Sequence, residues 1–169
     1  IGFQNLQGWV HSGLDNILVT PNGKLHRLLT KLAFENLVHP FQSFIIGQRL
    51  IAPRFSALFN IPLVFYGENQ AEYGNNIEEN FSPTMKPAFY EMKRSLDELH
   101  LGGVSARELV EKYEVSQNDL NPYLPVDGAR LRSLGTQVHY LGYYLKWDPQ
   151  ECFYYASEHT KFQTNSERT

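Results

Sequence analysis

The chain has 169 residues, of which 42% are hydrophobic, so it is long enough for a single domain with a substantial core. Its formal net charge of -3 argues against a general nucleic-acid binder or a binder of anionic membranes, since both usually need a basic face. No apolar stretch reaches the roughly 20 residues that cross a bilayer, and the single cysteine, Cys152, excludes an internal disulfide. We therefore expect a cytoplasmic protein without membrane insertion.

The first part of the chain predicts a helix, a strand and a second helix. The chain opens within an amphipathic helix that places Phe3, Leu6 and Trp9 on one face. A β-branched run at residues 15–20 predicts a strand, and the proline, asparagine and glycine that follow predict a turn. Residues 24–38 carry leucines at helical spacing and predict the second helix.

The next segment leads into a second strand. Residues 41–60 are apolar at helical spacing but contain Gly47 and Pro53, so the pattern fits one bent helix or two short helices. Residues 61–65 form a short apolar run that predicts a buried strand. Strand, helix, helix and strand is the crossover pattern of a parallel sheet. The sequence therefore predicts an α/β fold.

A third strand and a last helix are expected near the end of the chain. Residues 137–144 predict the strand. Asp148 is a good N-cap, Pro149 suits the first helical position, and Glu151 completes a capping box, so a helix through about His159 should follow. These elements indicate a return to the parallel sheet after a long interruption.

About sixty residues between the second and third strands are too many for a simple crossover and predict a helical insertion. Helices are expected at residues 87–99, after a capping box that begins at Ser105, and at residues 127–134. Residues 106–124 also scan like a helix-turn-helix that could bind DNA. Pro122 opposes that interpretation because it would cut the second helix to about five residues.

The most informative motif is YGENQAEYG at residues 66–74, directly after the second strand. Ligands of open α/β sheets bind beyond the carboxyl ends of the strands, so Glu68, Asn69 and Glu72 are the leading candidates for a site. The two carboxylates could hold Mg²⁺ or act as a general acid and base, and a glycosidase would use the same pair. A turn with two solvated glutamates fits the local string equally well.

Other polar residues are weaker candidates. Five basic residues could neutralise phosphates or could simply be solvated: Lys24, His26, Arg27, Arg49 and Arg54. The six histidines are scattered, and no pair has the i, i+4 spacing of a helical zinc site. His139 lies in a predicted strand, where a hydrogen-bonded core residue is the more common role.

Three segments together resemble the N-acetyl sugar amidotransferases of bacterial surface-polysaccharide biosynthesis: HPFQSFIIGQRLIAPRF, NIPLVFYGENQAEYGNN and YLGYYLKWDPQE. The earlier string LDNILVTPNGKLHRLLTKLAFENL is similar to a further region of that family. The family resembles the PP-loop ATP-pyrophosphatases. The resemblance implies a Rossmann-like parallel sheet of the adenine nucleotide alpha hydrolase type. On that basis, residues 1–81 would hold the second half of the nucleotide-binding domain, residues 82–134 the insertion, and residues 135–169 the last strand and helix.

The resemblance also implies a reaction. ATP would adenylate an acetamido oxygen of a nucleotide-linked N-acetyl sugar and release pyrophosphate, with Mg²⁺ offsetting the phosphate charge. Ammonia from a glutaminase subunit would then attack the carbon that carries this oxygen and expel AMP, which leaves an acetamidine. The product belongs to lipopolysaccharide O-antigen assembly.

The family motif assigns roles to residues of this chain. Glu68 is expected to bind Mg²⁺ or the phosphates, and Glu72 to act with it in catalysis. The expected ATP contacts are Thr20, Pro21, Asn22, Tyr66, Gly67 and Asn69. The expected sugar contacts are Phe41, Gln42, Gln48 and Tyr73.

The chain lacks the SGGxDS phosphate loop of the PP-loop group and the family's amino-terminal cysteine cluster. We therefore expect an internal piece of a longer enzyme. A non-catalytic nucleotide- or sugar-binding module that keeps the fold without the phosphate loop is the alternative.

Overall fold

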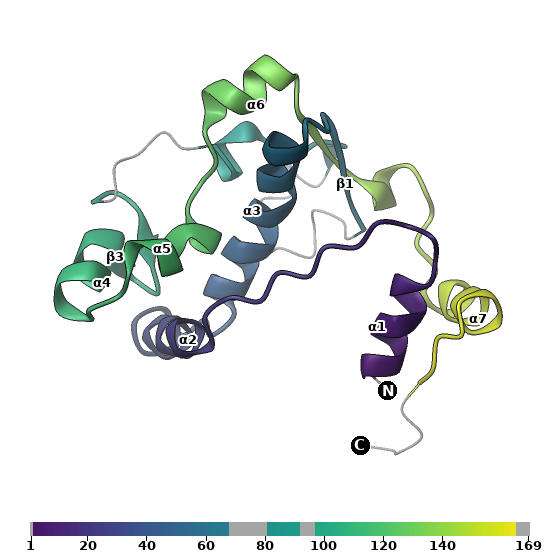
Figure 1. Ribbon diagram of the computed structural model, residues 1–169, viewed down its shortest axis with the longest axis horizontal. Helices are drawn as coiled ribbons and strands as arrows, with labels where there is room; N and C mark the ends of the chain where they lie inside the picture. The colour runs from purple at the N-terminus through teal and green to yellow at the C-terminus, as the bar shows by residue number, and fades with distance from the viewer. Residues whose placement is uncertain (1, 68–80, 92–96, 165–169) are drawn as a thin grey trace. The chain divides into compact units, whose positions relative to one another are not determined.

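The computed structural model describes residues 2–67, 81–91 and 97–164. The chain divides into two compact units, one of Ile1–Val19 with Leu145–Thr169 and the other of Thr20–Tyr144. We call them the terminal unit and the central unit. In the part that it describes, the structure contains seven α-helices, a parallel pair of strands and an antiparallel pair (Figure 1). The protein is therefore mixed α/β.

The central unit begins with helix α2, Gly23–Leu37, which confirms the prediction from the leucine spacing. Asn22 starts the helix because its side-chain oxygen accepts hydrogen bonds from the N–H groups of Lys24 and Leu25, at 3.0 and 3.4 Å. The helix ends at Val38, which has a left-handed conformation with a φ of 54°. The buried stripe consists of Leu25, Leu29, Leu32 and Ala33.

The next segment forms a single helix, α3 (Gln42–Phe59), and not two short ones. Pro53 lies inside this helix and its side chain is fully buried. Proline has no N–H, so it cannot donate the helical hydrogen bond to the carbonyl of Arg49, four residues earlier. The hydroxyl of Tyr66 donates to that carbonyl and to the carbonyl of Gln48, both at 2.9 Å. A side chain thus replaces the backbone donor that Pro53 removes.

Strands β1 (Leu63–Tyr66) and β4 (Gln137–Tyr140) pair in parallel, which confirms a strand at both predicted places. The second prediction, residues 137–144, was too long, because Leu141–Tyr143 form a 3-10 turn. One face of the pair is buried and carries Val64, Tyr66, Val138 and Tyr140. On the other face, Leu63 and Phe65 remain about half exposed. The apolar run before residue 66 therefore predicted the strand correctly but not its exposed face.

Residues 15–20, predicted as a strand, form neither a strand nor a helix. Ile17 and Leu18 are 55% and 75% exposed. β-branched residues favour a strand when they pack on a half-buried pleated surface, and these side chains have no such surface. In the described ranges the parallel sheet consequently has two strands, and the larger Rossmann-like sheet remains a prediction.

The region predicted as an insertion begins beside β4. The N–H of Met85 donates to the carbonyl of Val138 at 2.8 Å, and the N–H of Tyr140 donates to the carbonyl of Pro83 at 2.9 Å. Between them, Thr84 and His139 form an antiparallel bridge. Strand β4 therefore has β1 on one side and this segment on the other.

The predicted helix at residues 87–99 is wrong where the structure describes it. The chain makes only a 3-10 turn, Pro87–Phe89, before Glu91 forms a bridge with Val126. The side chain of Glu91 is buried and forms an ion pair with Arg132, 41 positions away. A buried carboxylate needs such a partner, so this long-range pairing overrides the local helical pattern.

An antiparallel pair follows, formed by β2 (His100–Leu101) and β3 (Val104–Ser105). Gly102 and Gly103 join the strands with φ angles of 63° and 78°, which the tight turn requires. Ser105 then caps helix α4 (Ala106–Lys112), as predicted, because its hydroxyl accepts from the N–H of Glu108 at 3.1 Å.

Two short helices complete this region. Helix α5 (Gln117–Leu120) has four residues and continues as a 3-10 turn, Asn121–Tyr123. It is too short to be the recognition helix of a DNA reader. Helix α6 (Gly128–Leu134) confirms the prediction for residues 127–134, with Asp127 as its N-cap.

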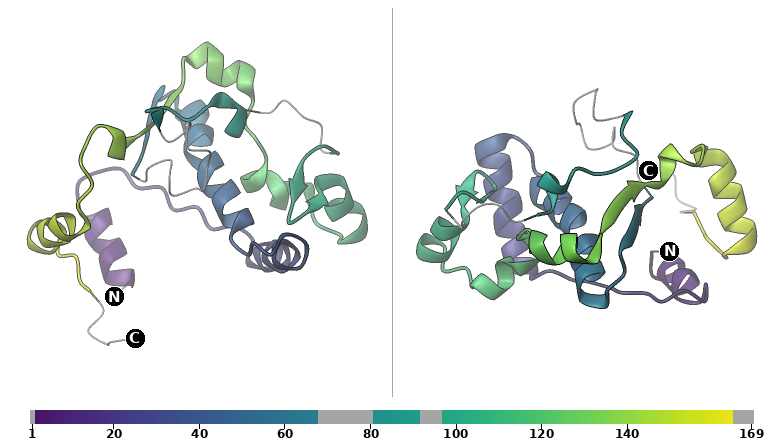
Figure 2. Two further views of the ribbon diagram at one scale, coloured as in Figure 1. Left: turned by 180° about the vertical axis from the view of Figure 1, so that it is seen from behind. Right: turned by 90° about the horizontal axis from the view of Figure 1, so that it is seen from above.

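Two apolar clusters hold the central unit together. The first packs the leucine stripe of α2 against α4, α5 and the β2–β3 pair, with Leu101, Leu109 and Leu120 fully buried. The second packs α3 against the inner face of the parallel strands and against α6, with Leu131 and Val138 at its centre. Helix α3 lies between α2 and β1 in both directions of view (Figures 1 and 2).

The terminal unit contains α1 (Gly2–Val10) and α7 (Pro149–His159). Asp148 caps α7 through hydrogen bonds from the N–H groups of Gln150 and Glu151, at 3.0 and 3.1 Å, which confirms the predicted start. A 3-10 turn, Leu141–Tyr143, precedes this unit at the end of β4. None of the helices in the described residues combines the length and the apolar character that a membrane span requires.

Candidate functional site

The parallel pairing of β1 and β4 brings two distant segments to one edge of the sheet. Tyr66 lies opposite Tyr140, so Gly67 and Leu141 leave the sheet side by side. This is the carboxyl edge, where ligands of open α/β sheets bind. The YGENQAEYG and YLGYYLKWDPQE segments of the sequence therefore start at the same edge.

Four of the predicted site residues lie outside the described residues: Glu68, Asn69, Glu72 and Tyr73. They include both predicted catalytic carboxylates and the predicted Mg²⁺ ligand. Their roles remain predictions. Gly67, the last described residue before them, is exposed at the carboxyl end of β1.

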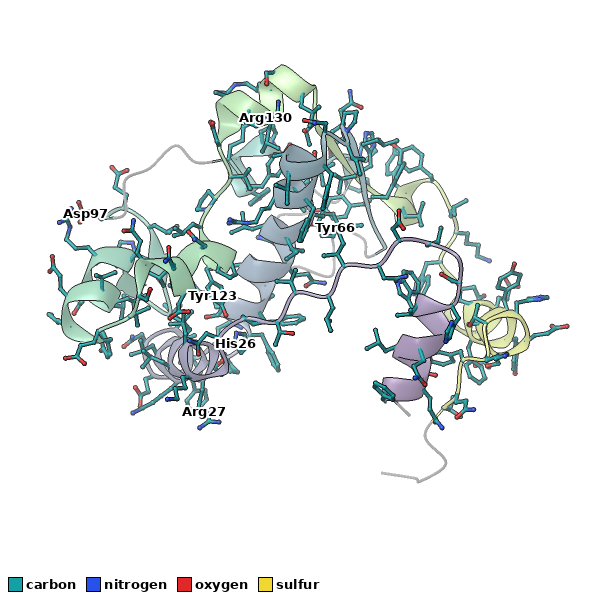
Figure 3. The ribbon with its side chains drawn as sticks, in the orientation of Figure 1. His26, Arg27, Tyr66, Asp97, Tyr123 and Arg130 are labelled. Atoms are coloured by element: carbon teal, nitrogen blue, oxygen red, sulfur yellow. The ribbon has the colours of Figure 1, made fainter. Side chains whose placement is uncertain are left out.

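Tyr66 is placed by the sheet and by α3. Its side chain is buried and its hydroxyl donates to the two α3 carbonyls described above (Figure 3). One of those carbonyls belongs to Gln48, a predicted sugar contact. The structure therefore shows Tyr66 as a tie between β1 and α3, and its contact with ATP remains a prediction.

The residues Thr20, Pro21 and Asn22 lie at the start of α2. The side-chain oxygen of Asn22 is engaged in capping that helix. Helix α3 lies between β1 and α2, the helix that these residues precede (Figure 2). The roles of these three residues as ATP contacts remain predictions.

Of the predicted sugar contacts, Gln42 has a clear structural role. Its side-chain oxygen accepts from the N–H of Gly102 at 2.7 Å, while the side-chain amide of Asn36 donates to the carbonyl of Gly102 at 2.9 Å. The two side chains hold the β2–β3 turn against α2 and α3. Phe41 precedes α3 and is 65% exposed.

Arg54 was a candidate phosphate contact, but in the structure its side chain binds backbone carbonyls of the protein. Its guanidinium donates to the carbonyls of Asn121 and Leu124, the latter at 2.7 Å. Burial lowers the pKa of this guanidinium, although arginine stays charged at neutral pH. The side chain clamps the 3-10 turn after α5 onto α3. Arg49 stacks over the ring of Phe89, 5.0 Å from its centroid.

Another candidate cation, His26, pairs with a buried phenol. Its Nδ1 lies 2.8 Å from the hydroxyl oxygen of Tyr123, and the two rings stack with their centroids 6.2 Å apart (Figure 3). Burial raises the pKa of Tyr123, so this residue stays a neutral phenol at physiological pH. Lys24 and Arg27 are exposed on the same helix. The sequence indicated no pairing between His26 and Tyr123.

A second histidine belongs to an aromatic cluster on the outer face of the parallel strands. The Nε2 of His139 lies 3.2 Å from the side-chain oxygen of Gln137, and its Nδ1 lies 2.6 Å from the hydroxyl of Tyr144. Both ring nitrogens of His139 therefore have a hydrogen-bond partner in the cluster. The ring of Phe65 lies 5.6 Å from His139 and 6.1 Å from Tyr144.

This cluster is the part of the site that the sequence interpretation missed. His139 is hydrogen-bonded, as expected of a strand histidine, but it is only partly buried. A usable signal was present, because a strand alternates its side chains and thus places Gln137 and His139 on one face. Placing Phe65 opposite His139 also required the register between β1 and β4, which no local pattern shows.

The fit to Mg²⁺ and ATP rests on the segment after β1. Within the described residues, no group of three histidine, cysteine, aspartate or glutamate side chains could hold a metal ion. Glu68 is the residue expected to hold Mg²⁺ or to face the phosphates, with Asn69 as an ATP contact and Glu72 in catalysis, and all three lie outside the described residues. In comparisons with known proteins, no family model and no curated protein matches this chain.

Proposed function

We propose that this chain is part of an ATP-dependent N-acetyl sugar amidotransferase of bacterial surface-polysaccharide biosynthesis. The observation that supports the proposal is the parallel pairing of β1 with β4. It brings two segments that resemble this family to the carboxyl edge of one sheet, although more than sixty residues separate them in the sequence. The proposed fold is the Rossmann-like sheet of the PP-loop group.

The proposed reaction consumes ATP, ammonia and a nucleotide-linked N-acetyl sugar. The acetamido oxygen attacks the α-phosphorus of ATP and pyrophosphate leaves. Ammonia then attacks the acetamido carbon, and AMP departs with that oxygen. The products are an acetamidine, AMP and pyrophosphate. Activation by ATP is required because an amide carbonyl is a poor electrophile and its oxygen is a poor leaving group.

In this proposal, Glu68 binds Mg²⁺ or faces the phosphates, while Asn69 and Glu72 orient the reactants. Gly67 supports the placement because it leaves β1 at the carboxyl edge without a side chain. The aromatic cluster of Phe65, His139 and Tyr144 flanks the same strands. Ammonia is supplied by a glutaminase subunit, and the protein acts in the cytoplasm.

The test uses the full-length protein with ATP, Mg²⁺, an ammonium salt and a UDP-linked diacetamido uronic acid. Replacing Glu68 with Gln removes the charge but keeps the shape, so the rate of AMP release should fall by at least about 100-fold. The control is Glu35→Gln, which removes an exposed carboxylate on α2 that lies 3.8 Å from Lys31. Unchanged AMP release in Glu68→Gln would rule out its role.

The same measurement separates the enzyme from the alternative. A non-catalytic nucleotide- or sugar-binding module would bind ATP or the nucleotide sugar but release no AMP with any combination of substrates. Binding without AMP release would therefore favour the module and reject the amidotransferase.

A further inference from the structure

The terminal unit contains a pocket whose described lining residues all belong to that unit. Its volume is about 550 Å³, within the range of small-molecule sites. One wall is α1 with the residues just after it, and the other is the end of α7 with the segment that follows. The lining includes Gln7 and His11 on the first wall and Tyr155, His159 and Lys161 on the second.

The two walls are joined by specific contacts. The side-chain amide of Asn5 donates to the carbonyl of Gln163 and accepts from its N–H, both at 2.9 Å. At Gly8, an added Cβ would lie 2.9 Å from the carbonyl oxygen of Thr160, so only glycine allows this close approach. Thr160 in turn bonds back to α7, through its N–H and its hydroxyl to the carbonyl of Ala156. The pocket is thus part of the packing between the two segments.

The polar groups of the lining favour a negatively charged ligand. Lys161 supplies a positive charge, and His11 and His159 supply imidazole nitrogens. Among the described residues that line the pocket, none carries a carboxylate. The neighbouring carboxylate of Glu158 lies 3.9 Å from Nε2 of His159, on the same helix. The described lining therefore offers an anion one lysine and two imidazoles.

The remaining lining groups suit a ligand with hydroxyl groups. Gln4, Gln7 and Gln163 carry amides that both donate and accept hydrogen bonds, and Ser12 adds a hydroxyl. The ring of Tyr155 lies 4.3 Å from that of His159 and gives the pocket an aromatic wall. Amides around an aromatic surface can bind the alternating hydroxyl groups and C–H faces of a sugar ring.

We propose that this pocket binds a phosphorylated monosaccharide, with the phosphate at Lys161 and the two imidazoles and the sugar ring against Tyr155. The proposal does not depend on the amidotransferase function, because none of the described lining residues has a role assigned in that reaction.

The test measures binding by isothermal titration calorimetry with three probes: glucose 6-phosphate, inorganic phosphate and glucose. The proposal predicts that glucose 6-phosphate binds at least tenfold more tightly than either of the other two. Equal affinity for glucose 6-phosphate and inorganic phosphate would overturn it, because the sugar would then contribute nothing. Absence of saturable binding of glucose 6-phosphate would overturn it as well.

A matched pair of variants places the ligand in the pocket. Lys161→Met removes the charge of the pocket, and Lys146→Met removes a charge from the same unit outside the lining. Lys161→Met should weaken the binding of glucose 6-phosphate at least tenfold, while Lys146→Met should leave it unchanged. Equal affinities of the two variants would contradict the proposal.

A second measurement keeps the test decisive if Lys161→Met perturbs folding. In NMR spectra of the unaltered protein, glucose 6-phosphate should shift the ring signals of His11, Tyr155 and His159. The ring signals of His26 and His139, in the central unit, serve as the reference. Shifts confined to the reference histidines would place the ligand elsewhere and reject the pocket.

Discussion

Tyr66 and Pro53 should be energetically coupled, because the tyrosine hydroxyl donates to the carbonyl of Arg49, to which the proline has no N–H to donate. In the unaltered protein, Tyr66→Phe removes a donor that lies 2.9 Å from the carbonyls of Arg49 and Gln48. A buried acceptor that loses its hydrogen bond costs about 1–3 kcal/mol. We therefore expect Tyr66→Phe to lower the free energy of unfolding by that amount.

The cost should fall when Pro53 is replaced by alanine. In Pro53→Ala, the new backbone N–H can donate to the Arg49 carbonyl in the ordinary helical pattern. The Gln48 carbonyl already faces the N–H of Ala52, one turn later. Tyr66→Phe should consequently cost about 1 kcal/mol less in the Pro53→Ala background than in the unaltered protein.

Urea denaturation of the four proteins of this double-mutant cycle measures the coupling. The matched control combines Pro53→Ala with Tyr144→Phe, which removes a hydroxyl that bonds His139 on the other face of the sheet. That pair should be additive within about 0.5 kcal/mol. If Tyr66→Phe costs the same in both backgrounds, the hydroxyl does not replace the missing amide and the reasoning is wrong.

Two further predictions concern the packing of the central unit. Gly102→Ala should destabilise the protein by about 1–3 kcal/mol more than Gly135→Ala. Both positions have a positive φ, but of the two only Gly102 would place an added Cβ against backbone and side-chain atoms of α2, from 2.9 Å. Equal unfolding midpoints of the two variants in urea would reject the close approach. Burial raises the pKa values of Tyr90 and Tyr123 above the usual 10.0, with Glu91 adding to the effect at Tyr90. The folded state therefore holds both phenolic protons more tightly than the unfolded chain does. The stabilisation of the folded state that results is complete below about pH 10 and is lost as the pH rises further. The double variant Tyr90→Phe with Tyr123→Phe should show a shallower alkaline loss of stability, and an unchanged slope would contradict the assigned cause.

Helices with local start signals could be predicted from the sequence. Asn22, Ser105, Asp127 and Asp148 each cap a helix whose position the sequence indicated. A cap acts within three residues of its own position, so a single sequence contains the whole signal. The places of both parallel strands were also predictable from their apolar runs, but the end of β4 at Tyr140 was not, since the predicted run continues to residue 144.

The wrong predictions depend on distant partners. Residues 15–20 have strand-forming side chains, but they pair with no strand in the part of the chain that the structure describes. The helical pattern near Glu91 gives way to a bridge with Val126 and an ion pair with Arg132. Neither partner can be inferred from the local string, because both are more than thirty residues away.

The candidate site was predictable only in its location. The strand exit after Tyr66 follows from the sequence, and the structure places it beside the exit of β4. The environments of the side chains could not be predicted from the sequence. Asn22 caps a helix, Gln42 binds the β2–β3 turn, and Tyr66 donates to carbonyls of α3, the helix that contains Pro53. The hydrogen bond between His139 and Tyr144 could be identified only from the structure.

The proposed amidotransferase reaction is tested most directly by following the acetamido oxygen. The full-length protein would be given ATP, an ammonium salt and a UDP-linked diacetamido uronic acid whose acetamido oxygen carries a heavy isotope. Adenylation predicts that the label appears in the phosphate of the released AMP, in step with acetamidine formation. Unlabelled AMP, or a labelled sugar with no AMP formed, would contradict the proposed function.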